Sequence, residues 1–447
     1  MLGGSACMVM VAPSSSLPPA ATQPAPGFRF WIDEILWSQG RVAVELVEEV
    51  LRAAGGTRTG GPPRHAAPQG PVDSSPALGC HHTRRWDVLW TKSTYAFRAV
   101  RAGLVPGQLV SAVCGLNCLT MKKRMLATLK AAYGAEGAWQ YTPVSFALPE
   151  EQGAWQAWVH AQHSRAAGGG AHGWGAPPGE QLWMLKTGQD AGKGLQLLPA
   201  QQALAQAAQQ PRPGAHRKHT VQVAQLYCHQ PMLLEGRKFH LRLWVVVAGY
   251  APLQAYLHSR GLVLFSSELY QEGRPFVEEE QATGGAGGSQ GAHAARSSSS
   301  TGPAHLPPHA RIAPGHVTNL ARNSSGLVWD LQQLRQRMGD AAYDALWAKL
   351  TRACAAALRA ARPSLQEANA WLQPPTPHYG FQLLGVDFLL DAACQPWLLE
   401  FNSSPSTMTL HDDPPTAHLI ADTKRAMLAD MLGLVAHRIQ PPQPQPQ

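Results

Sequence analysis

Two apolar, β-rich runs near the end of the 447-residue chain carry acidic side chains, and this combination constrains the fold more than any other feature. The runs are Phe381–Asp391 and Trp397–Asn402, and a short turn that contains Pro396 joins them. Because the side chains of a β-strand alternate between its two faces, Glu400 and Asn402 share one face of the second run. We therefore expect a β-hairpin with one polar face between strongly apolar flanks.

The pairing of the two runs is expected to bring two carboxylates together. Symmetric pairing about the turn puts Leu390 opposite Trp397, and Asp387 then falls opposite Glu400. Two carboxylates directly across a strand pair repel each other, and a cation between them removes that penalty. With the amide oxygen of Asn402 they form a hard, all-oxygen ligand set that suits Mg²⁺ held together with nucleotide phosphates. The alternative is a pair of surface acids, which the apolar flanks disfavour.

Two other segments place positive charge on strands. Lys186 ends an apolar run and precedes the glycine-rich stretch Gly188–Gly194, an arrangement in which backbone N–H groups and a lysine bind phosphate. Glycine-rich turns also connect ordinary hairpins, and the Walker A pattern is absent. Lys238, His240 and Arg242 share one face of another apolar run and predict an anion-binding groove, with a solvated sheet edge as the alternative.

The remaining apolar patterns mix strands and helices. Leucines at helical spacing predict a helix within Leu327–Ala361, and the closing segment Thr416–Ile439 reads as an amphipathic helix. Lys238–Ala248 and Leu253–Leu257 are β-rich runs separated by a hairpin signal. Because the strand pairs lie in hairpins, we expect an α+β fold with mixed or antiparallel sheets and flanking helices.

Several stretches are rich in Gly, Pro, Ser, Ala or Gln and poor in large apolar residues. They are Ala53–Leu78, Ala166–Gly179, Gln209–Lys218, Thr283–Ala304 and the tail from Gln440. Such segments bury too little apolar surface to offset the entropy lost on ordering. We expect them to be low-complexity loops that interrupt the fold.

Composition narrows the classes of partner. The formal net charge of +8 favours an acidic partner without choosing among kinds. The seven cysteines include no CxxC pair, which disfavours a zinc site and suits a reducing compartment. No apolar run reaches about 18 residues, so we expect no spanning helix and a soluble, cytoplasmic protein.

A series of motifs in fixed order resembles the tubulin tyrosine ligase-like family from about Trp86 to Leu434. After the Lys186 strand and its glycine-rich loop come Gln225-Leu-Tyr227, Glu235-Gly-Arg-Lys-Phe-His-Leu-Arg242, Gly261-Leu-Val-Leu-Phe265, His316-Val-Thr-Asn319, Asp387 and Trp397-Leu-Leu-Glu-Phe-Asn402. Upstream, Pro106-Gly-Gln108, Gly115 to Lys122 and Tyr141 to Pro149 also match. Each motif is common alone, but the ordered set is specific.

The resemblance implies an ATP-grasp fold that holds ATP between two sheets. For the nucleotide, it implies that Lys186 and Lys193 bind phosphate, that Gln225 to Tyr227 form the hinge beside adenine, and that Lys238 lies near the ribose. Thr318 and Asn319 would lie near the nucleotide, and Arg242 near the phosphates or the incoming amino acid. The implied ligands of Mg²⁺ are Asp387, Glu400 and Asn402. Arg242 and Lys186 are the expected catalytic residues. The implied domains are a mostly disordered or low-complexity segment 1–85, an N-terminal subdomain 86–165, a central subdomain 181–236, a C-terminal subdomain 237–439 with a disordered insert near 283–304, and a disordered tail 440–447.

The implied reaction is ATP-dependent activation of a carboxyl group as an acyl phosphate, followed by attack of an amino group to give an amide. The phrase Leu233–Phe239, followed by Gly261–Phe265, is closer to the glutamate-adding branch than to the glycylating or tyrosinating branches. The expected partners are ATP, Mg²⁺, a free amino acid and the acidic tails of tubulin or microtubules, without nucleic acid or membrane. We expect a monomer in the cytoplasm, on the cytoskeleton, in the cilium or at the basal body.

Three positions depart from the family pattern. Ala191 replaces a basic residue of the glycine-rich loop, which Lys193 in the same loop can offset. His240 replaces an aspartate, and Leu264 replaces an arginine for which Arg260 is the nearest substitute. These changes predict ATP binding with slow ligation, and Leu264→Arg as a faster variant. They leave open a catalytically weak or inactive relative that binds nucleotide or microtubules, and a ligase with a non-tubulin protein acceptor.

Overall fold

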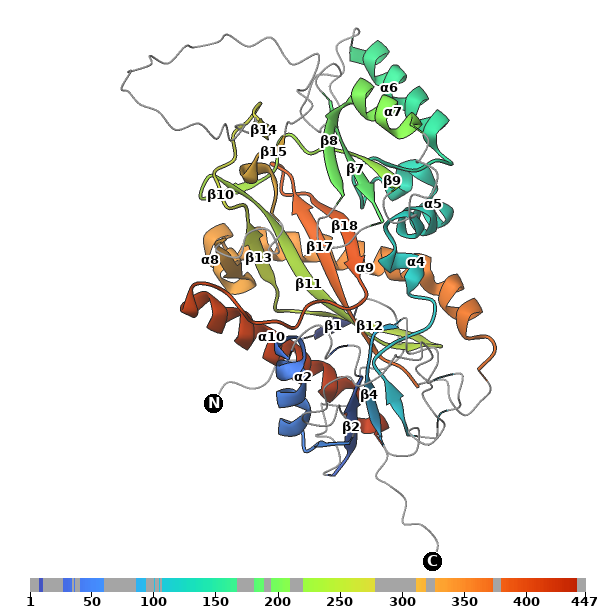
Figure 1. Cartoon of the computed structure of the whole chain (residues 1–447), viewed down its shortest axis with the longest axis vertical. Helices are drawn as coiled ribbons and strands as arrows, with labels where there is room; N and C mark the ends of the chain where they lie inside the picture. The colour runs from blue at the N-terminus through green and yellow to red at the C-terminus, as the bar shows by residue number, and fades with distance from the viewer. Residues whose placement is uncertain are drawn as a thin grey trace, which may run out of the picture. The chain divides into compact units, whose positions relative to one another are not determined.

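A computed structural model describes most of the regular elements of the chain. The described residues are 8–10, 27–33, 36, 41–59, 86–93, 100, 104, 107–166, 181–188, 194–209, 220–277, 311–318, 326–372 and 379–439. They form two compact units, whose helices and strands are labelled in Figure 1. The first unit comprises Met1–Thr142, Phe239–Phe265 and Ser324–Gln447, and the second comprises Pro143–Lys238 and Ser266–Asn323.

The main sheet of the first unit is antiparallel and is built on the long strand β11. Its strands are β1 (Met8–Met10), β12 (Leu253–His258), β11 (Arg237–Tyr250), β13 (Leu262–Phe265), β16 (Val328–Asp330), β17 (Gln382–Leu390) and β18 (Pro396–Asn402). β11 pairs with β12, β13 and β17 along different parts of its length, and β18 pairs with β17. Nearly all residues of β11 and β17 are buried, which explains why their sequences are apolar on both faces.

Three helices pack against this sheet. α8 (Leu331–Met338) contacts β13, α9 (Asp340–Asn369) contacts β12 and β18, and α10 (Pro414–Val435) contacts β16. The buried residues of α9, among them Leu346, Leu350 and Leu358, recur at helical spacing. The helices expected from the apolar periodicity of Leu327–Ala361 and Thr416–Ile439 are therefore present.

The start of α8 is fixed by a reciprocal cap. The Asp330 carboxylate accepts the Gln333 N–H at 2.8 Å, and the Gln333 side chain accepts the Asp330 N–H at 2.9 Å. This capping box satisfies two backbone donors that a helix start leaves unpaired. It holds α8 directly after β16, so the helix turns back over the sheet.

A second sheet of the first unit is parallel and lies partly where little structure was expected. Its strands are β3 (Thr57–Arg58), β2 (Arg29–Ile32), β4 (Val88–Trp90) and β5 (Leu109–Val110), and α2 (Val42–Ala53) accompanies them. Segment 1–85 was predicted to be mostly disordered, so this prediction is wrong for residues 27–33 and 41–59. The apolar stripe of α2, Leu46, Val47, Val50 and Leu51, gives the reason, because it is buried in the core.

The second unit contains a four-stranded antiparallel sheet in the order β6-β9-β7-β8. Its strands are β6 (Ser145–Ala147), β7 (Leu182–Thr187), β8 (Leu195–Pro199) and β9 (Val221–Leu226), with helices α6 (Gln152–Ala166) and α7 (Ala200–Ala208). Fully buried Trp183 packs against Trp155 and Trp158 of α6, with ring centroids 5.1 and 5.6 Å apart. The short pairs β14 (Phe276–Val277) with β15 (Arg311–Ile312) and β10 (Leu233–Leu234) with the start of β11 complete the unit.

The unit boundaries differ from the domains expected from the sequence. The expected N-terminal subdomain 86–165 is divided after Thr142, and β11 passes from one unit to the other. The low-complexity stretches 60–78, 167–179, 210–218 and 283–304 and the tail from Gln440 lie outside the described residues. Within the described residues, no helix combines the length and apolar character needed to cross a membrane.

The capping box makes a stability prediction. Asp330→Ala removes the side-chain acceptor and should destabilise the first unit by about 1 kcal/mol, whereas Asp330→Asn retains a good N-cap and should cost almost nothing. Urea denaturation followed by circular dichroism measures both. An equal loss in the two variants would contradict the capping role.

Candidate functional site

In the β17–β18 hairpin Asp387 lies opposite Glu400, as predicted. The strand register that brings them together differs from the predicted symmetric pairing. Next to the turn, Leu389 pairs with Trp397, so the predicted pairing of Leu390 with Trp397 is wrong by one residue. The register then shifts between Phe388 and Asp387. A bulge of one extra residue in β18 produces this shift and restores the opposition of the two carboxylates.

The acidic residues share one face of the sheet with Arg242. Asp387 pairs with Arg242 of β11 on one side and with Glu400 of β18 on the other, and Asn402 pairs with Gly385. The chain packs closely over Gly385, because a Cβ there would lie 3.1 Å from Pro405 and 3.5 Å from the side chains of Arg242 and Asn402. The predicted ligands therefore lie on one face, next to a position with little room for a larger side chain.

Arg242 and Asp387 form a two-pronged ion pair. Nε and one terminal N–H of Arg242 donate to the two carboxylate oxygens of Asp387 at 2.5 and 2.9 Å. The two side chains are only 22% and 8% exposed. Burial alone would raise the pKa of Asp387, but the charge and hydrogen bonds of Arg242 lower it below its ordinary value. The carboxylate is thus kept ionised inside the protein.

The other acidic residue has a cation of its own. Glu400 lies 3.3 Å from Nζ of Lys122, the first residue of α5 (Lys122–Ala138). The Asn402 amide is close enough to Asp387 to help lower the pKa of that carboxyl. Its buried Nδ2 nevertheless reaches no acceptor with hydrogen-bond geometry in the described part of the chain. An orphaned buried polar atom beside two carboxylates marks a place where a further group would be accommodated.

A buried lysine that the sequence analysis did not select lies near the same pair. Lys424 of α10 donates to the Met408 carbonyl, and burial together with the charge of Arg242 lowers its pKa to about 7. It falls among Ile420, Met427 and Leu428, which are also buried. The sequence contained a signal for this buried lysine, because Lys424 falls on the apolar stripe of an amphipathic helix.

The donor set fits magnesium better than a transition metal. Within the described residues, no three His, Cys, Asp or Glu side chains gather as a metal site. Asp387, Glu400 and Asn402 offer two carboxylates and an amide, and Mg²⁺ is usually held by one or two carboxylates together with waters and phosphates. Of the Asn402 amide only the oxygen can serve in such a set, because Nδ2 is a hydrogen-bond donor.

The second unit contains a buried cluster around Tyr227 and Lys238. Nζ of Lys238 donates to the Tyr227 hydroxyl at 2.9 Å and lies 4.2 Å from the centre of its ring. The hydroxyl lies 2.8 Å from Nδ1 of His316, whose Nε2 lies 3.0 Å from the Gln271 carbonyl. Because a carbonyl can only accept, Nε2 carries the His316 proton and Nδ1 accepts from Tyr227.

Burial sets the protonation of this cluster. It lowers the pKa of Lys238 to about 8, and burial together with the charge of Lys238 lowers the pKa of His316 to about 4. His316 is therefore neutral at physiological pH, and Lys238 remains largely protonated. The sequence analysis used His316 only as part of a motif, so its direct contact with the predicted hinge residue Tyr227 was missed.

The other predicted nucleotide residues are only partly brought together. Buried Gln225 of β9 donates from its side chain to Ser145 at 2.9 Å, so this amide is engaged within the second unit. Lys186 is half-buried near the end of β7, and Thr318 is half-buried two residues after His316. Lys193 and Asn319 lie outside the described residues, as does Ala191.

Comparison with known proteins decides the family. Residues 104–281 and 318–440 match the Tubulin-tyrosine ligase family. The chain belongs to this family. Its α+β architecture, with parallel and antiparallel sheets and flanking helices, is the fold class expected from the hairpins in the sequence.

Two relatives of this family member are named as glutamylases. Tubulin polyglutamylase ttll6 of Danio rerio is 29% identical over 230 residues, which cover 50% of this chain and 25% of the relative. Tubulin monoglutamylase TTLL4 of Homo sapiens is 29% identical over 216 residues, which cover 47% of this chain and 16% of the relative. The chain thus spans well under half the length of either relative.

Two of the three departures from the family pattern form a single pair. His240 of β11 lies directly opposite Leu264 of β13, and both are buried. Replacing a charged pair together leaves neither partner buried without its counter-charge. Arg260, the expected substitute, is instead exposed in the connection between β12 and β13.

The ion pair of Arg242 makes a pH prediction for this family member. Because the folded pKa of Asp387 is lowered, its stabilisation is present above the ordinary carboxyl pKa of about 4 and is lost as the pH falls further. Arg242→Gln leaves a buried unpaired carboxylate and should cost about 3–5 kcal/mol at neutral pH. Without the arginine, burial raises the pKa of Asp387 instead of leaving it lowered. Protonation of Asp387 as the pH falls towards 4 then removes the unpaired charge, so the stability difference between Arg242→Gln and the native chain should become smaller.

Melting temperatures of the native chain and Arg242→Gln as a function of pH measure this effect. The double variant Arg242→Gln/Asp387→Asn is the matched control, because it removes both charges and little volume. It should be more stable than the single variant at neutral pH. Parallel pH profiles for the native chain and the single variant would contradict the role of the pair.

Proposed function

We propose that this chain is an ATP- and Mg²⁺-dependent ligase that joins an amino acid, glutamate, to tubulin through an acyl phosphate. The observation that carries the proposal is the single sheet face on which Asp387, Glu400 and Asn402 lie beside Arg242. Membership of the Tubulin-tyrosine ligase family and the names of the relatives support the same class of reaction.

In this proposal Asp387, Glu400 and Asn402 hold the magnesium ion. A magnesium ion held there would supply charge neutralisation to the phosphoryl group. Glu400, which now lies beside Lys122, would be one of its ligands, and Arg242 on the same face would orient an anionic phosphate or carboxylate. Enzymes assist phosphoryl transfer chiefly by such positioning and charge neutralisation.

The second unit supplies the proposed contacts to the nucleotide. Lys186 and Lys193 bind phosphate, Gln225 to Tyr227 form the hinge beside adenine, and Lys238 lies near the ribose, together with Thr318 and Asn319. The contact of Lys238 with Tyr227 keeps its ammonium group in one position despite burial. A cation that is already dehydrated and fixed requires little reorganisation when it meets an anion.

The acceptor follows from charge and from the relatives. The net charge of +8 complements the acidic tails of tubulin, and both relatives reported above are named for tubulin. A cytoskeletal location follows from such an acceptor, and the cilium or basal body remains a prediction. A ligase with another acidic protein as its acceptor uses the same chemistry.

A second candidate function is a relative that binds nucleotide or microtubules with little catalysis. It is favoured by the pair His240–Leu264, which leaves an apolar side chain where the family pattern has an arginine. Compared with the family pattern, His240 and Leu264 together leave the main sheet with one negative and one positive charge fewer.

Ligation itself is the direct test. The chain is incubated with tubulin, ATP, Mg²⁺ and each labelled amino acid in turn, and incorporation is measured. We expect labelled glutamate on tubulin, lost in Glu400→Gln, which removes a charge and little volume. The circular dichroism and melting temperature of Glu400→Gln are the control for folding. ATP binding without incorporation of any amino acid would favour the second candidate.

The pairing of His240 with Leu264 revises the expectation for an arginine at position 264. Leu264 is buried, so Leu264→Arg alone places a charge there without a counter-charge and should cost about 3–5 kcal/mol. Adding His240→Asp supplies the counter-charge and should recover much of this loss. A double-mutant cycle by urea denaturation measures the coupling, and additive effects of the two changes would contradict a direct pair.

A further inference from the structure

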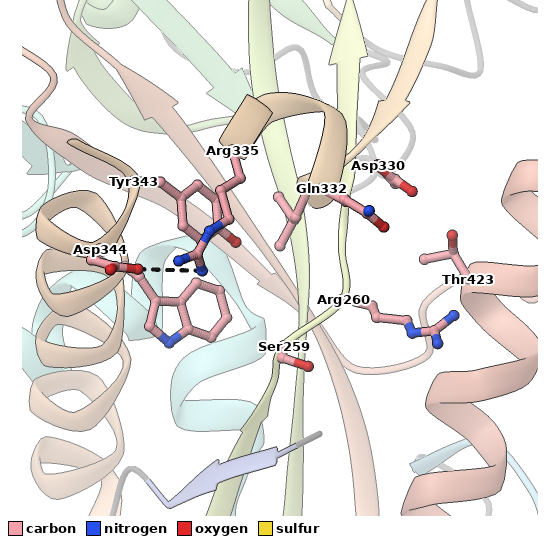
Figure 2. A pocket seen from close by; sticks show the side chains of 10 residues that line it. Ser259, Arg260, Asp330, Gln332, Arg335, Tyr343, Asp344 and Thr423 are labelled. Carbon is pink, nitrogen blue, oxygen red and sulfur yellow. Dashed lines mark ion pairs between the residues drawn. The ribbon is translucent and has the colours of Figure 1, made fainter. Parts of the chain in front are cut away.

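A pocket of about 360 Å³ in the first unit lies apart from the residues assigned above. The connection between β12 and β13 forms its floor, and α8, α9 and α10 surround it (Figure 2). This volume is within the range of small-molecule sites. None of the predicted nucleotide or metal residues lines it.

Two opposite charges face this pocket without pairing with each other. The guanidinium group of Arg260 makes no hydrogen bond or ion pair with any described residue, and Figure 2 shows it extending towards Thr423 of α10. Asp330 uses one carboxylate oxygen, Oδ1, for the cap of α8. Its Oδ2 has no partner in the described part of the chain. One free cation and one free anionic oxygen are thus available to a ligand.

The other charged side chains of the pocket are already engaged. Arg335 contacts Asp340 at 2.5 Å and Asp344 at 3.3 Å, and its guanidinium lies 5.3 Å from the centre of the Tyr343 ring. Tyr343 and Trp347 are nearly parallel, with an angle of 11° and centroids 6.3 Å apart. With Leu331 they provide the apolar part of the lining.

The pocket and the carboxylate group use different side chains, because none of Arg242, Asp387, Glu400 and Asn402 lines the pocket. Leu331 lies on the side of the sheet to which Leu243 points, since a Cβ on Gly261 would meet both. Asp330 pairs with Leu262, which pairs with Arg242, so Asp330 lies on the Arg242 side at the edge of the sheet.

We propose that this pocket binds a free α-amino acid with an apolar side chain, as a zwitterion. Its carboxylate pairs with the guanidinium of Arg260, since charge-assisted contacts of arginine with carboxylates are among the strong hydrogen bonds. Its ammonium group donates to Oδ2 of Asp330. The side chain packs against Leu331 and the aromatic pair. A phosphate group would face the same Arg260 but also the negative charges of Asp330 and Asp344, so a polyanion fits less well.

Calorimetric titration of the full chain with L-phenylalanine tests this proposal. We expect saturable binding, while N-acetyl-L-phenylalanine, which lacks the ammonium group, and L-phenylalaninamide, which lacks the carboxylate, bind at least about tenfold more weakly. Arg260→Gln and Asp330→Asn should each weaken binding of L-phenylalanine by about tenfold to a hundredfold. Asp330→Asn keeps the helix cap, so its fold is preserved.

Two control variants separate this pocket from other sites. Arg337→Gln changes an exposed arginine of α8 that does not line the pocket, and Arg242→Gln/Asp387→Asn changes the carboxylate face without leaving a buried charge unpaired. Both should bind L-phenylalanine as the native chain does. No saturable binding up to about 10 mM, or equal binding by native chain and Arg260→Gln, would overturn the proposal. Loss of binding in Arg242→Gln/Asp387→Asn with retention in Arg260→Gln would also overturn it, because the site would then be the carboxylate face.

Discussion

The ion pair between Arg242 and Asp387 is the interaction on which the main sheet depends. An ionised carboxylate in the middle of a buried strand is costly unless a cation compensates it. The pairing of β17 with β11 provides that cation directly across the ladder, at 2.5 and 2.9 Å. β18 then adds Glu400 on the same face, so a structural pair becomes part of a larger charged group.

Basic side chains outnumber acidic ones around this face. Lys122, Arg242 and Lys424 come from three different elements and surround only two carboxylates. Lys424 is only 5% exposed, and burial together with the charge of Arg242 lowers its pKa to about 7. The second unit likewise buries Lys238, against Tyr227. Dehydrated cations of this kind suit phosphates and carboxylates, the groups on which the proposed ligase acts.

Local sequence patterns predicted strands and helices well, but they did not predict the contacts between segments that are distant in the sequence. Alternation was enough to place Glu400 and Asn402 on one face, because a strand has only two faces, and symmetric pairing about the turn added Asp387 although its register near the turn was wrong by one residue. It did not reveal the bulge in β18, which compensates for the asymmetric turn. The partnership of Lys122 with Glu400 spans most of the chain, so no local pattern contains it. The strands and helix before residue 60 were missed because glycine- and proline-rich neighbours masked the apolar stripe of α2.

The central claim is that the face of Asp387 and Glu400 holds a divalent ion together with nucleotide. Electron paramagnetic resonance of Mn²⁺, used in place of Mg²⁺, measures this without relying on turnover. The account predicts that the native chain with ATP binds Mn²⁺ more tightly than ATP alone does. Folded Asp387→Asn and Glu400→Gln should lose this difference. Equal Mn²⁺ binding by the native chain and both variants would contradict the account.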